Sequence, residues 1–200
     1  MSPRPETMSP TAERDILPVS GDALIIVDLQ NDFLTGGSLA VPDGDAVISV
    51  LNTWIRRFRA AELPIFATRD WHPADHCSFR DQGGPWPSHC VAGTKGAEFT
   101  AELALPPDAL IHSKATTPER EAYSDFEDGG FGQKLREMGV TRLFIGGLAT
   151  DYCVHATVLD GLKEGFRVVL LTDAIRPVEV HPGDGDRAIA QMREAGALMA

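Results

Sequence analysis

The sequence LFIGGLATDYCVH, at residues 143–155, carries the strongest indication of the fold. Residues 143–146 form a short apolar run that predicts a buried strand and leads into a pair of glycines. A polar turn follows at residues 149–151, and Cys153 then begins a run with helical character that extends to residue 164. A strand that turns sharply into a helix leaves the first N–H groups of the helix free to bind a ligand.

Cys153 occupies a position that suits a nucleophile. The positive end of a helix stabilises a thiolate, so we expect the pKa of Cys153 to fall below the ordinary value of about 8.5. The same N–H groups can hold a developing oxyanion. The alternative is a buried, unreactive cysteine, because free cysteines are among the most buried residues in proteins.

Apolar runs alternate with helix-like segments along the rest of the chain. Strands are predicted at residues 23–27, 64–68, 109–112, 142–146 and 167–171, with residues 197–200 as a candidate sixth strand. Helices are predicted at residues 45–61, 132–138, 153–164 and 184–194. This alternation favours a three-layer, doubly wound α/β domain with a mostly parallel central sheet of five or six strands.

Composition narrows the class of protein. Two hundred residues suit one domain, and the formal charge of −11 makes binding to nucleic acid unfavourable. No apolar run is long enough to cross a membrane. Three cysteines without a signal peptide favour a cytoplasmic protein over a disulfide framework. We expect residues 1–20 to form a flexible tail and residues 21–200 to form the domain.

Three chemically complementary residues follow predicted strands. Asp28, Lys114 and Cys153 supply a base, a cation and a nucleophile, which are the groups that thiol-based acyl transfer requires. Because ligands bind at the carboxyl ends of strands in open α/β sheets, we expect these side chains to lie close together. Each residue alone is also consistent with an ordinary structural or surface polar group.

A second group of polar residues lies in the long loop at residues 70–100. Asp70, His72, His76 and His89 are ligand types suited to zinc, iron or manganese, and we predict a metal site there. Each of these histidines could instead be a surface residue. Cys77 and Cys90 directly follow candidate histidines, so a structural zinc site that includes both is a competing interpretation.

With these motifs, the sequence resembles the nicotinamidases of the isochorismatase-like cysteine hydrolase superfamily. The resemblance covers about residues 22–175 and rests on Lys114 together with the motifs VDLQNDF (27–33), RDWHPADH (69–76), WPSHCVAGT (86–94), AYSDFE (122–127) and GLATDYCV (147–154). It implies hydrolysis of nicotinamide to nicotinate and ammonia through a cysteine thioester, as a step of NAD salvage. It also implies one divalent metal ion (zinc, iron or manganese, with zinc favoured) that holds the pyridine nitrogen. We expect a homo-oligomer.

The resemblance also assigns roles to individual residues. It implies a catalytic triad of Asp28, Lys114 and Cys153, and metal ligands Asp70, His72, His76 and His89. It implies a cis peptide between Leu148 and Ala149, with the N–H groups of Ala149 and Cys153 forming an oxyanion hole. Residues expected to contact the substrate are Phe33, Trp86, Tyr123 and Leu148. Tyr152 departs from the histidine of some relatives, and Asp125 stands where many relatives have glycine.

Alternative functions differ in what they require of the metal and the thiol. Another amidase of the same superfamily, acting on a carbamoyl or ureido compound, would need no metal to hold a ring nitrogen. An isochorismatase would lack the nucleophile that Cys153 supplies. A non-catalytic metal-binding or redox protein is the alternative from a different class. The rate of thiol alkylation at neutral pH separates a reactive cysteine from a buried, inert one.

Overall fold

The computed structural model describes residues 16–127 and 129–200, and these residues form an α/β fold around one six-stranded sheet. All strand pairs are parallel, in the order β3-β2-β1-β4-β5-β6. The strands are β1 (Asp22–Val27), β2 (Ile65–Asp70), β3 (Leu110–Lys114), β4 (Arg142–Leu148), β5 (Arg167–Arg176) and β6 (Leu198–Met199). The predicted α/β fold with a parallel sheet is therefore confirmed, and the candidate sixth strand is present.

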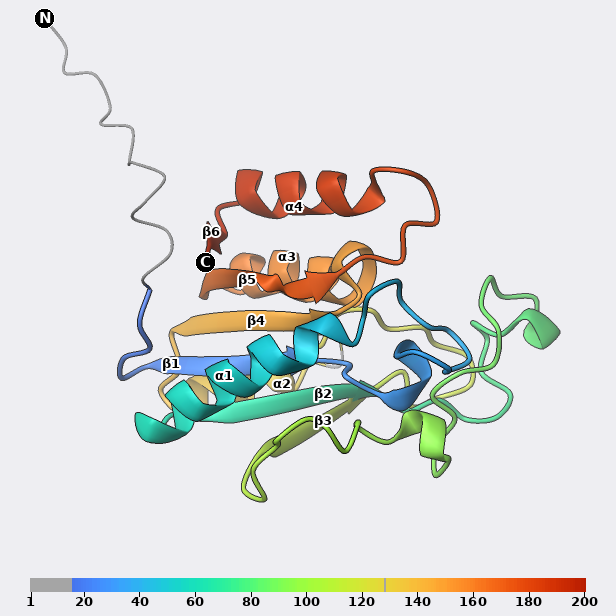
Figure 1. Cartoon of the computed structure of the whole chain (residues 1–200), viewed down its shortest axis with the longest axis horizontal. Helices are drawn as coiled ribbons and strands as arrows, with labels where there is room; N and C mark the ends of the chain where they lie inside the picture. The colour runs from blue at the N-terminus through green and yellow to red at the C-terminus, as the bar shows by residue number, and fades with distance from the viewer. Residues whose placement is uncertain (1–15, 128) are drawn as a thin grey trace, which may run out of the picture.

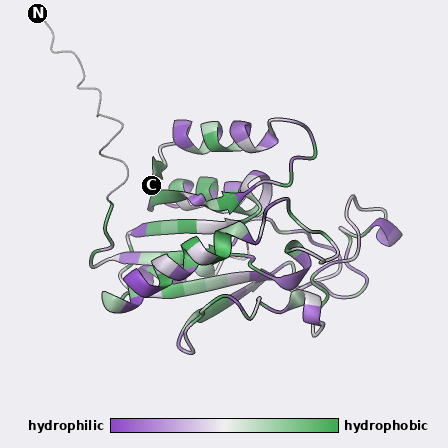
Figure 2. Cartoon of the chain, in the orientation of Figure 1, coloured by the Kyte–Doolittle hydropathy of each residue, from purple (hydrophilic) through white to green (hydrophobic). Residues whose placement is uncertain are grey.

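Helices cover both faces of the sheet, as Figure 1 shows. Helix α1 (Ala46–Ala60) packs on one face, with the core residues Leu24, Ile26 and Phe144. The opposite face is covered by α2 (Phe131–Glu137), α3 (His155–Lys163) and α4 (Asp184–Glu194). The strands are largely apolar and the helices are apolar on one side (Figure 2), which is the pattern of a sheet buried between two helical layers.

Helix α1 shows why the sequence predicted this layer well. Its buried residues recur at helical spacing: Val47, Ile48, Leu51, Trp54, Ile55 and Phe58. Trp54 and Phe58 both pack against Phe144 of β4, with ring centroids 5.4 and 5.2 Å away. Burial of this aromatic cluster fixes α1 across the middle of the sheet.

The order of the strands determines where a ligand can bind. From β1 the chain runs outward through β2 to β3, and it then returns to place β4 on the other side of β1. This reversal is a topological switch point, and open α/β sheets bind ligands beyond the carboxyl ends of the strands there. Asp28 directly follows β1, while Asp70 and Lys114 are the last residues of β2 and β3.

The end of β4 makes a tight turn. Gly147 has a φ of 132°, and a Cβ atom there would lie 2.0 Å from the carbonyl oxygen of Val27, so only glycine fits. The Leu148–Ala149 peptide is cis, as the resemblance implied. A single π-helical turn at Thr150–Val154 follows, and α3 begins at residue 155. The helix predicted from residue 153 therefore starts two residues late.

Other boundaries differ modestly from the predictions. Strand β5 extends to Arg176, five residues beyond its predicted end, because a shift of register between Ile145 and Gly147 lets it continue along β4. Of the predicted tail, residues 1–15 lie outside the described residues, and Ile16 packs against the core on the α1 side. None of the described helices has the length and apolar character needed to cross a membrane.

Candidate functional site

The site lies beyond the carboxyl ends of β1–β4, where the structure brings three distant side chains together. Lys114 Nζ donates to Asp28 Oδ2 and to Asp70 Oδ1, each at 2.5 Å. The Cys153 thiol is hydrogen-bonded to Asp28. Its Sγ atom and one oxygen each of Asp28 and Asp70 lie within 4.8 Å of one another. A base, a cation and a thiol thus meet in one buried centre.

Burial and ion pairing set the charges of this centre. Asp28 and Lys114 are both 0% exposed. Burial raises the pKa of Asp28 to about 6, although the charge of Lys114 opposes this shift. Burial alone would lower the pKa of Lys114, but the charges of Asp28 and Asp70 hold it well above its usual value. At neutral pH the centre therefore contains an ionised Asp28, able to accept a proton, beside a permanently charged Lys114.

The pKa expected for Cys153 is wrong. Burial raises the pKa of its thiol well above the usual value; the charge of Lys114 opposes this rise, and the charges of Asp28 and Asp70 add to it. The expectation considered the start of the helix but not the carboxylates that face the sulfur. The resting form is the neutral thiol, so the proton must leave to Asp28 as the sulfur attacks.

The turn that carries Cys153 is held from both sides. The carbonyl of Ala149 accepts the N–H groups of Tyr152 and Val154, both at 3.1 Å. On the other side, the Asp151 carboxylate accepts the backbone N–H groups of Val178 and Glu179, at 2.9 and 3.0 Å. These bonds anchor the turn between the cis peptide and α3 to the segment after β5. The predicted oxyanion donors, Ala149 and Cys153, belong to this anchored turn.

Three of the four predicted metal ligands form one buried group. The ligand atoms of Asp70, His72 and His89 lie within 4.8 Å of one another. His72 Nδ1 donates to the carbonyl of Ala115 at 3.3 Å, and His89 Nδ1 donates to the carbonyl of Pro87 at 2.8 Å. Each ring therefore keeps the lone pair of its Nε2 atom, and His72 Nε2 is buried without a hydrogen-bond partner in the described part of the chain.

This group fits a divalent metal ion. Two imidazoles and one carboxylate are typical of catalytic zinc sites, which keep a further position open for water or substrate. Burial would raise the pKa of Asp70, but the charge of Lys114 and the ring of His72, whose Nε2 atom lies 3.7 Å from Asp70 Oδ2, hold it well below its usual value, so the carboxylate is ionised. The orphaned His72 nitrogen gives a direct structural reason to place a cation there.

His76 lies beside this group but not in it. Its ring stacks on that of His72, with the centroids 4.1 Å apart, and its Nε2 atom donates to the carbonyl of Arg120 at 3.0 Å. Its Nδ1 atom faces the hydroxyl of Ser78 at 2.8 Å. Both ring nitrogens are therefore engaged, and His76 instead clusters with His72 and Glu121. His76 therefore contacts His72 but is not part of the group formed by Asp70, His72 and His89.

The alternative structural zinc site finds no support. Cys77 and Cys90, like Cys153, are free thiols, and neither belongs to a group of potential ligands among the residues that the structure describes. Burial raises the pKa of Cys90 far above its usual value, so this thiol stays protonated. A metal would need the thiolate as its ligand.

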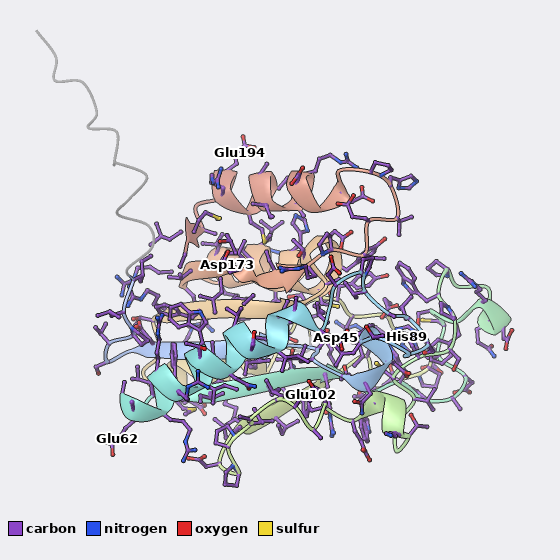
Figure 3. The ribbon with its side chains drawn as sticks, in the orientation of Figure 1. Asp45, Glu62, His89, Glu102, Asp173 and Glu194 are labelled. Atoms are coloured by element: carbon purple, nitrogen blue, oxygen red, sulfur yellow. The ribbon has the colours of Figure 1, made fainter. Side chains whose placement is uncertain are left out.

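Aromatic side chains surround the buried centre. The ring of Phe33 lies 5.6 Å from that of His89, which Figure 3 labels in the loops beyond the strand ends. Trp86 Nε1 donates to the Tyr123 hydroxyl at 3.1 Å, and Tyr152 packs on both rings, with centroids 5.1 and 5.6 Å away. Leu148, also predicted to contact substrate, is fully buried at the end of β4.

Two residues with clear positioning roles were missed in the sequence. The Gln30 side chain accepts the N–H of Asp70 at 2.8 Å and donates to its carbonyl at 2.7 Å, so it clamps the backbone of that residue. Thr68 donates to Asp28 Oδ1 at 3.2 Å. Gln30 lies in the quoted VDLQNDF motif, which offered a signal, whereas Thr68 could be recognised only once the register of β1 and β2 was known.

Comparisons with known proteins agree with this geometry. Residues 22–200 match the isochorismatase domain family. A nicotinamidase from Escherichia coli K12 is 39% identical, with 88% of this chain and 93% of the relative covered. A pyrazinamidase from Pyrococcus horikoshii, solved in complex with zinc, is 51% identical with a TM-score of 0.86, covering 90% of this chain and 98% of that one.

A structure of PnC1 from L. infantum in complex with nicotinate is also similar. It is 37% identical with a TM-score of 0.85, and the match covers 92% of this chain and 94% of that one. The family match spans the sheet and the four α-helices that the structure describes. The chain therefore belongs to the isochorismatase domain family, among its nicotinamidases.

Proposed function

We propose that the protein hydrolyses nicotinamide to nicotinate and ammonia, with Cys153 as the nucleophile. The observation that carries this proposal is the convergence of Asp28, Lys114 and Cys153 beside a buried group of metal ligands. The similarity to a nicotinamidase and to a nicotinate complex supports the choice of substrate. We further propose that the enzyme is a cytoplasmic homo-oligomer acting in pyridine nucleotide salvage.

In the first half of the proposed reaction, Asp28 accepts the thiol proton of Cys153 while the sulfur attacks the amide carbon. The negative charge on the substrate oxygen is held by the N–H groups of Ala149 and Cys153. Asp28 then gives its proton to the departing nitrogen, which leaves as ammonia, and a thioester remains on Cys153. Lys114 keeps its proton throughout and holds Asp28 in place.

In the second half, water attacks the thioester while Asp28 accepts one of its protons. Collapse of the tetrahedral intermediate releases nicotinic acid, which ionises to nicotinate by giving its proton to water or to the released ammonia, and Asp28 returns its own proton to the sulfur of Cys153. The pKa of about 6 suits this double role, because Asp28 is ionised at neutral pH and still releases a proton readily. The protons therefore balance over one cycle, and the enzyme returns to its resting thiol.

Asp70, His72 and His89 would hold the metal ion. When bound, the ion supplies a Lewis acid for the lone pair of the pyridine nitrogen, and so orients the ring. Phe33, beside His89, and the cluster of Trp86, Tyr123 and Tyr152 would enclose the ring with apolar surface. Enclosure of this kind excludes water from the acyl carbon and strengthens the electrostatic contacts around it.

The activity itself is tested by ammonia release from nicotinamide. The wild-type protein is expected to release ammonia, and Cys153→Ala is expected to lower turnover by about 10³-fold or more while the fold stays intact. Cys77→Ala is the matched control, because Cys77 is also a free thiol but takes no part in the proposed reaction. No release at any metal loading, together with release from a carbamoyl or ureido compound, would assign the rival amidase activity instead.

The metal ligands are tested by metal content. His72→Ala removes one of three ligands, so bound metal should fall and KM should rise more than kcat falls, because the ion chiefly orients the substrate. His181→Ala is the control, because that side chain is 79% exposed. A full complement of metal in the His72 variant, measured by elemental analysis, would contradict the assignment of His72 as a metal ligand.

A further inference from the structure

The backbone of Cys90 connects the two histidines of the metal-ligand group. Cys90 directly follows His89 in the chain, and its carbonyl accepts the N–H of His72 at 3.0 Å. The carbonyl of His72 in turn accepts the N–H of Ala92 at 2.8 Å, so the two segments run side by side as a short parallel bridge. The relative position of the two imidazoles therefore depends on where the Cys90 backbone is held.

The chain turns at Cys90 in an unusual conformation. Its φ of 46° lies in the left-handed region, which residues with a side chain rarely adopt. Such a conformation persists only where the surrounding structure fixes it, and it is common near binding sites. Because the turn comes directly after the ligand His89, whatever fixes this turn also fixes the start of the ligand's side chain.

Asp32 supplies that support from another part of the chain. It lies in the short 3₁₀ turn Asn31–Phe33, which follows β1, and its Oδ2 atom accepts the N–H of Cys90 at 2.7 Å. A hydrogen bond to a carboxylate is shorter and stronger than one between neutral groups. The other oxygen, Oδ1, accepts the N–H of Ser38 at 3.3 Å. The carboxylate therefore joins the segment after β1 to the loop that carries His89.

Gly96 shows how closely the loop fits around this carboxylate. A Cβ atom at Gly96 would lie within 2.5 Å of both oxygens of Asp32, so any side chain there would displace the carboxylate from the Cys90 N–H. The neighbouring residue Asn31 holds the same stretch of loop, because its Nδ2 atom donates to the carbonyl of Lys95 at 2.7 Å. The position of the Asp32 carboxylate is thus determined from both sides.

We propose that Asp32 is a positioning residue for the metal ligands and acts through the backbone of Cys90, an inference that rests on the metal site of the proposed function. The carboxylate fixes the Cys90 N–H, and the Cys90 carbonyl fixes the backbone of His72. One hydrogen bond thereby sets the spacing of two of the three ligands before the ion binds. Ligands that are already in place lose less freedom on binding, so the affinity for the ion rises. This role needs no contact of Asp32 with the ion or the substrate.

The test measures the dissociation constant for zinc by competition with a chromophoric chelator, without substrate. Asp32→Ala removes the acceptor and should raise this Kd by about 10-fold or more, as is typical when an outer partner of a metal ligand is lost. Asp32→Asn keeps an oxygen acceptor and should restore most of the affinity. Asp184→Ala is the matched control, because it removes a carboxylate that also accepts a backbone N–H at 2.7 Å but belongs to no ligand group among the described residues. An unchanged Kd in Asp32→Ala would overturn the proposal.

Gly96→Ala tests the same contact in a chain that keeps Asp32. The added methyl group should push the carboxylate away from the Cys90 N–H and raise the Kd for zinc by about 10-fold. In the Asp32→Ala background the space is open, so the same change should alter the Kd by less than about 2-fold. Effects that simply multiply in the double variant would contradict a role through Asp32. Should Asp32→Ala not fold, an unchanged Kd in Gly96→Ala alone would refute the inference.

A purely structural role would give a different pattern. Asp32→Ala would then lower the free energy of unfolding of the metal-free protein, measured in urea with a chelator present, while the Kd for zinc stayed at the wild-type value. A wild-type protein that binds no zinc would refute the ligand group and this inference together. A wild-type protein that binds zinc but releases no ammonia from nicotinamide would refute the proposed function alone, because the comparison of affinities needs no turnover.

Discussion

Strand β1 has a buried carboxylate at each end, and the two have different surroundings. At its start, Asp22 lies opposite Arg142 of β4 and receives the guanidinium on both oxygens, at 2.8 and 2.6 Å. At its end, Asp28 receives Lys114, which also binds Asp70 opposite it in the register of β2 and β3. The Asp22–Arg142 pair joins the neighbouring strands β1 and β4, whereas Lys114 reaches Asp28 across β2, which lies between β3 and β1.

The difference lies in the balance of charge. Asp22 has one cation to itself, a backbone N–H from Val19 at 2.7 Å, and a partner whose side chain is 13% exposed. Lys114 serves two buried carboxylates, with the Cys153 thiol beside them. An excess of negative charge in a dry site is costly, and only a proton, a metal ion or a substrate can relieve it. An unbalanced ion pair, rather than burial alone, therefore distinguishes the functional end of the sheet.

The largest effect is expected from Lys114→Met. The change leaves Asp28 and Asp70 buried without their cation, which should lower the free energy of unfolding by about 3–5 kcal/mol. Turnover should be lost as well, because Asp28 is no longer held. Urea denaturation and ammonia release measure the two effects. A stability within about 1 kcal/mol of wild type would show that the charge at this end is balanced by something else.

The same change at the other end should have a smaller effect. Arg142→Met leaves Asp22 with the Val19 N–H, so the free energy of unfolding should fall by about 1–3 kcal/mol. Turnover should remain at the wild-type level, because the ion pair lies at the amino ends of β1 and β4, whereas Cys153 lies beyond the carboxyl end of β4. A loss of activity comparable to that of Lys114→Met would contradict the division between a structural end and a functional end.

This division also explains how much the sequence could predict. The strands and the convergence of Asp28, Lys114 and Cys153 followed from apolar runs that end in polar residues, because parallel strands bring their carboxyl ends to one edge. The balance of charge at the carboxyl ends of the strands could not be predicted from these runs. The raised pKa of Cys153 depends first on its burial and then on the two carboxylates that face the sulfur, and both are set by the register of strands far apart in sequence.

The metal ligands show a similar limit. Asp70, His72 and His89 were recognised as ligand types, and the structure gathers all three. His76 has the same chemistry, but its Nε2–H group donates a hydrogen bond to the carbonyl of Arg120. For His72 and His76, the ring nitrogen that stays free depends on the carbonyls of Ala115 and Arg120, which lie 43 and 44 positions away, and spacing in the sequence carries no information on that. Gln30 lies in the quoted VDLQNDF motif, but its contact with the backbone of Asp70, 40 positions away, follows only from the way the strands pair.

The smallest expected effect, and the sharpest test of the charge excess, is the pH dependence of stability in Asp125→Asn. Asp125 has a pKa of about 8 in the folded chain against an ordinary 3.8, so the folded state retains a proton that the unfolded state releases. Its contribution is fully present below the unfolded value and is lost as pH rises through about 8. The slope is at most about 1.4 kcal/mol per pH unit.

Asparagine removes this loss, so between about pH 6 and 8 the variant should gain stability relative to wild type by roughly 1 kcal/mol per pH unit. Urea unfolding with a chelator present, at several pH values, measures the difference. Asp28, whose pKa is raised to about 6, should still make both proteins less stable as pH rises from about 4 to 6. Parallel curves from pH 6 to 8 would mean that Asp125 is already ionised in the fold. In that case the functional end would hold three buried carboxylates against the single ammonium group of Lys114.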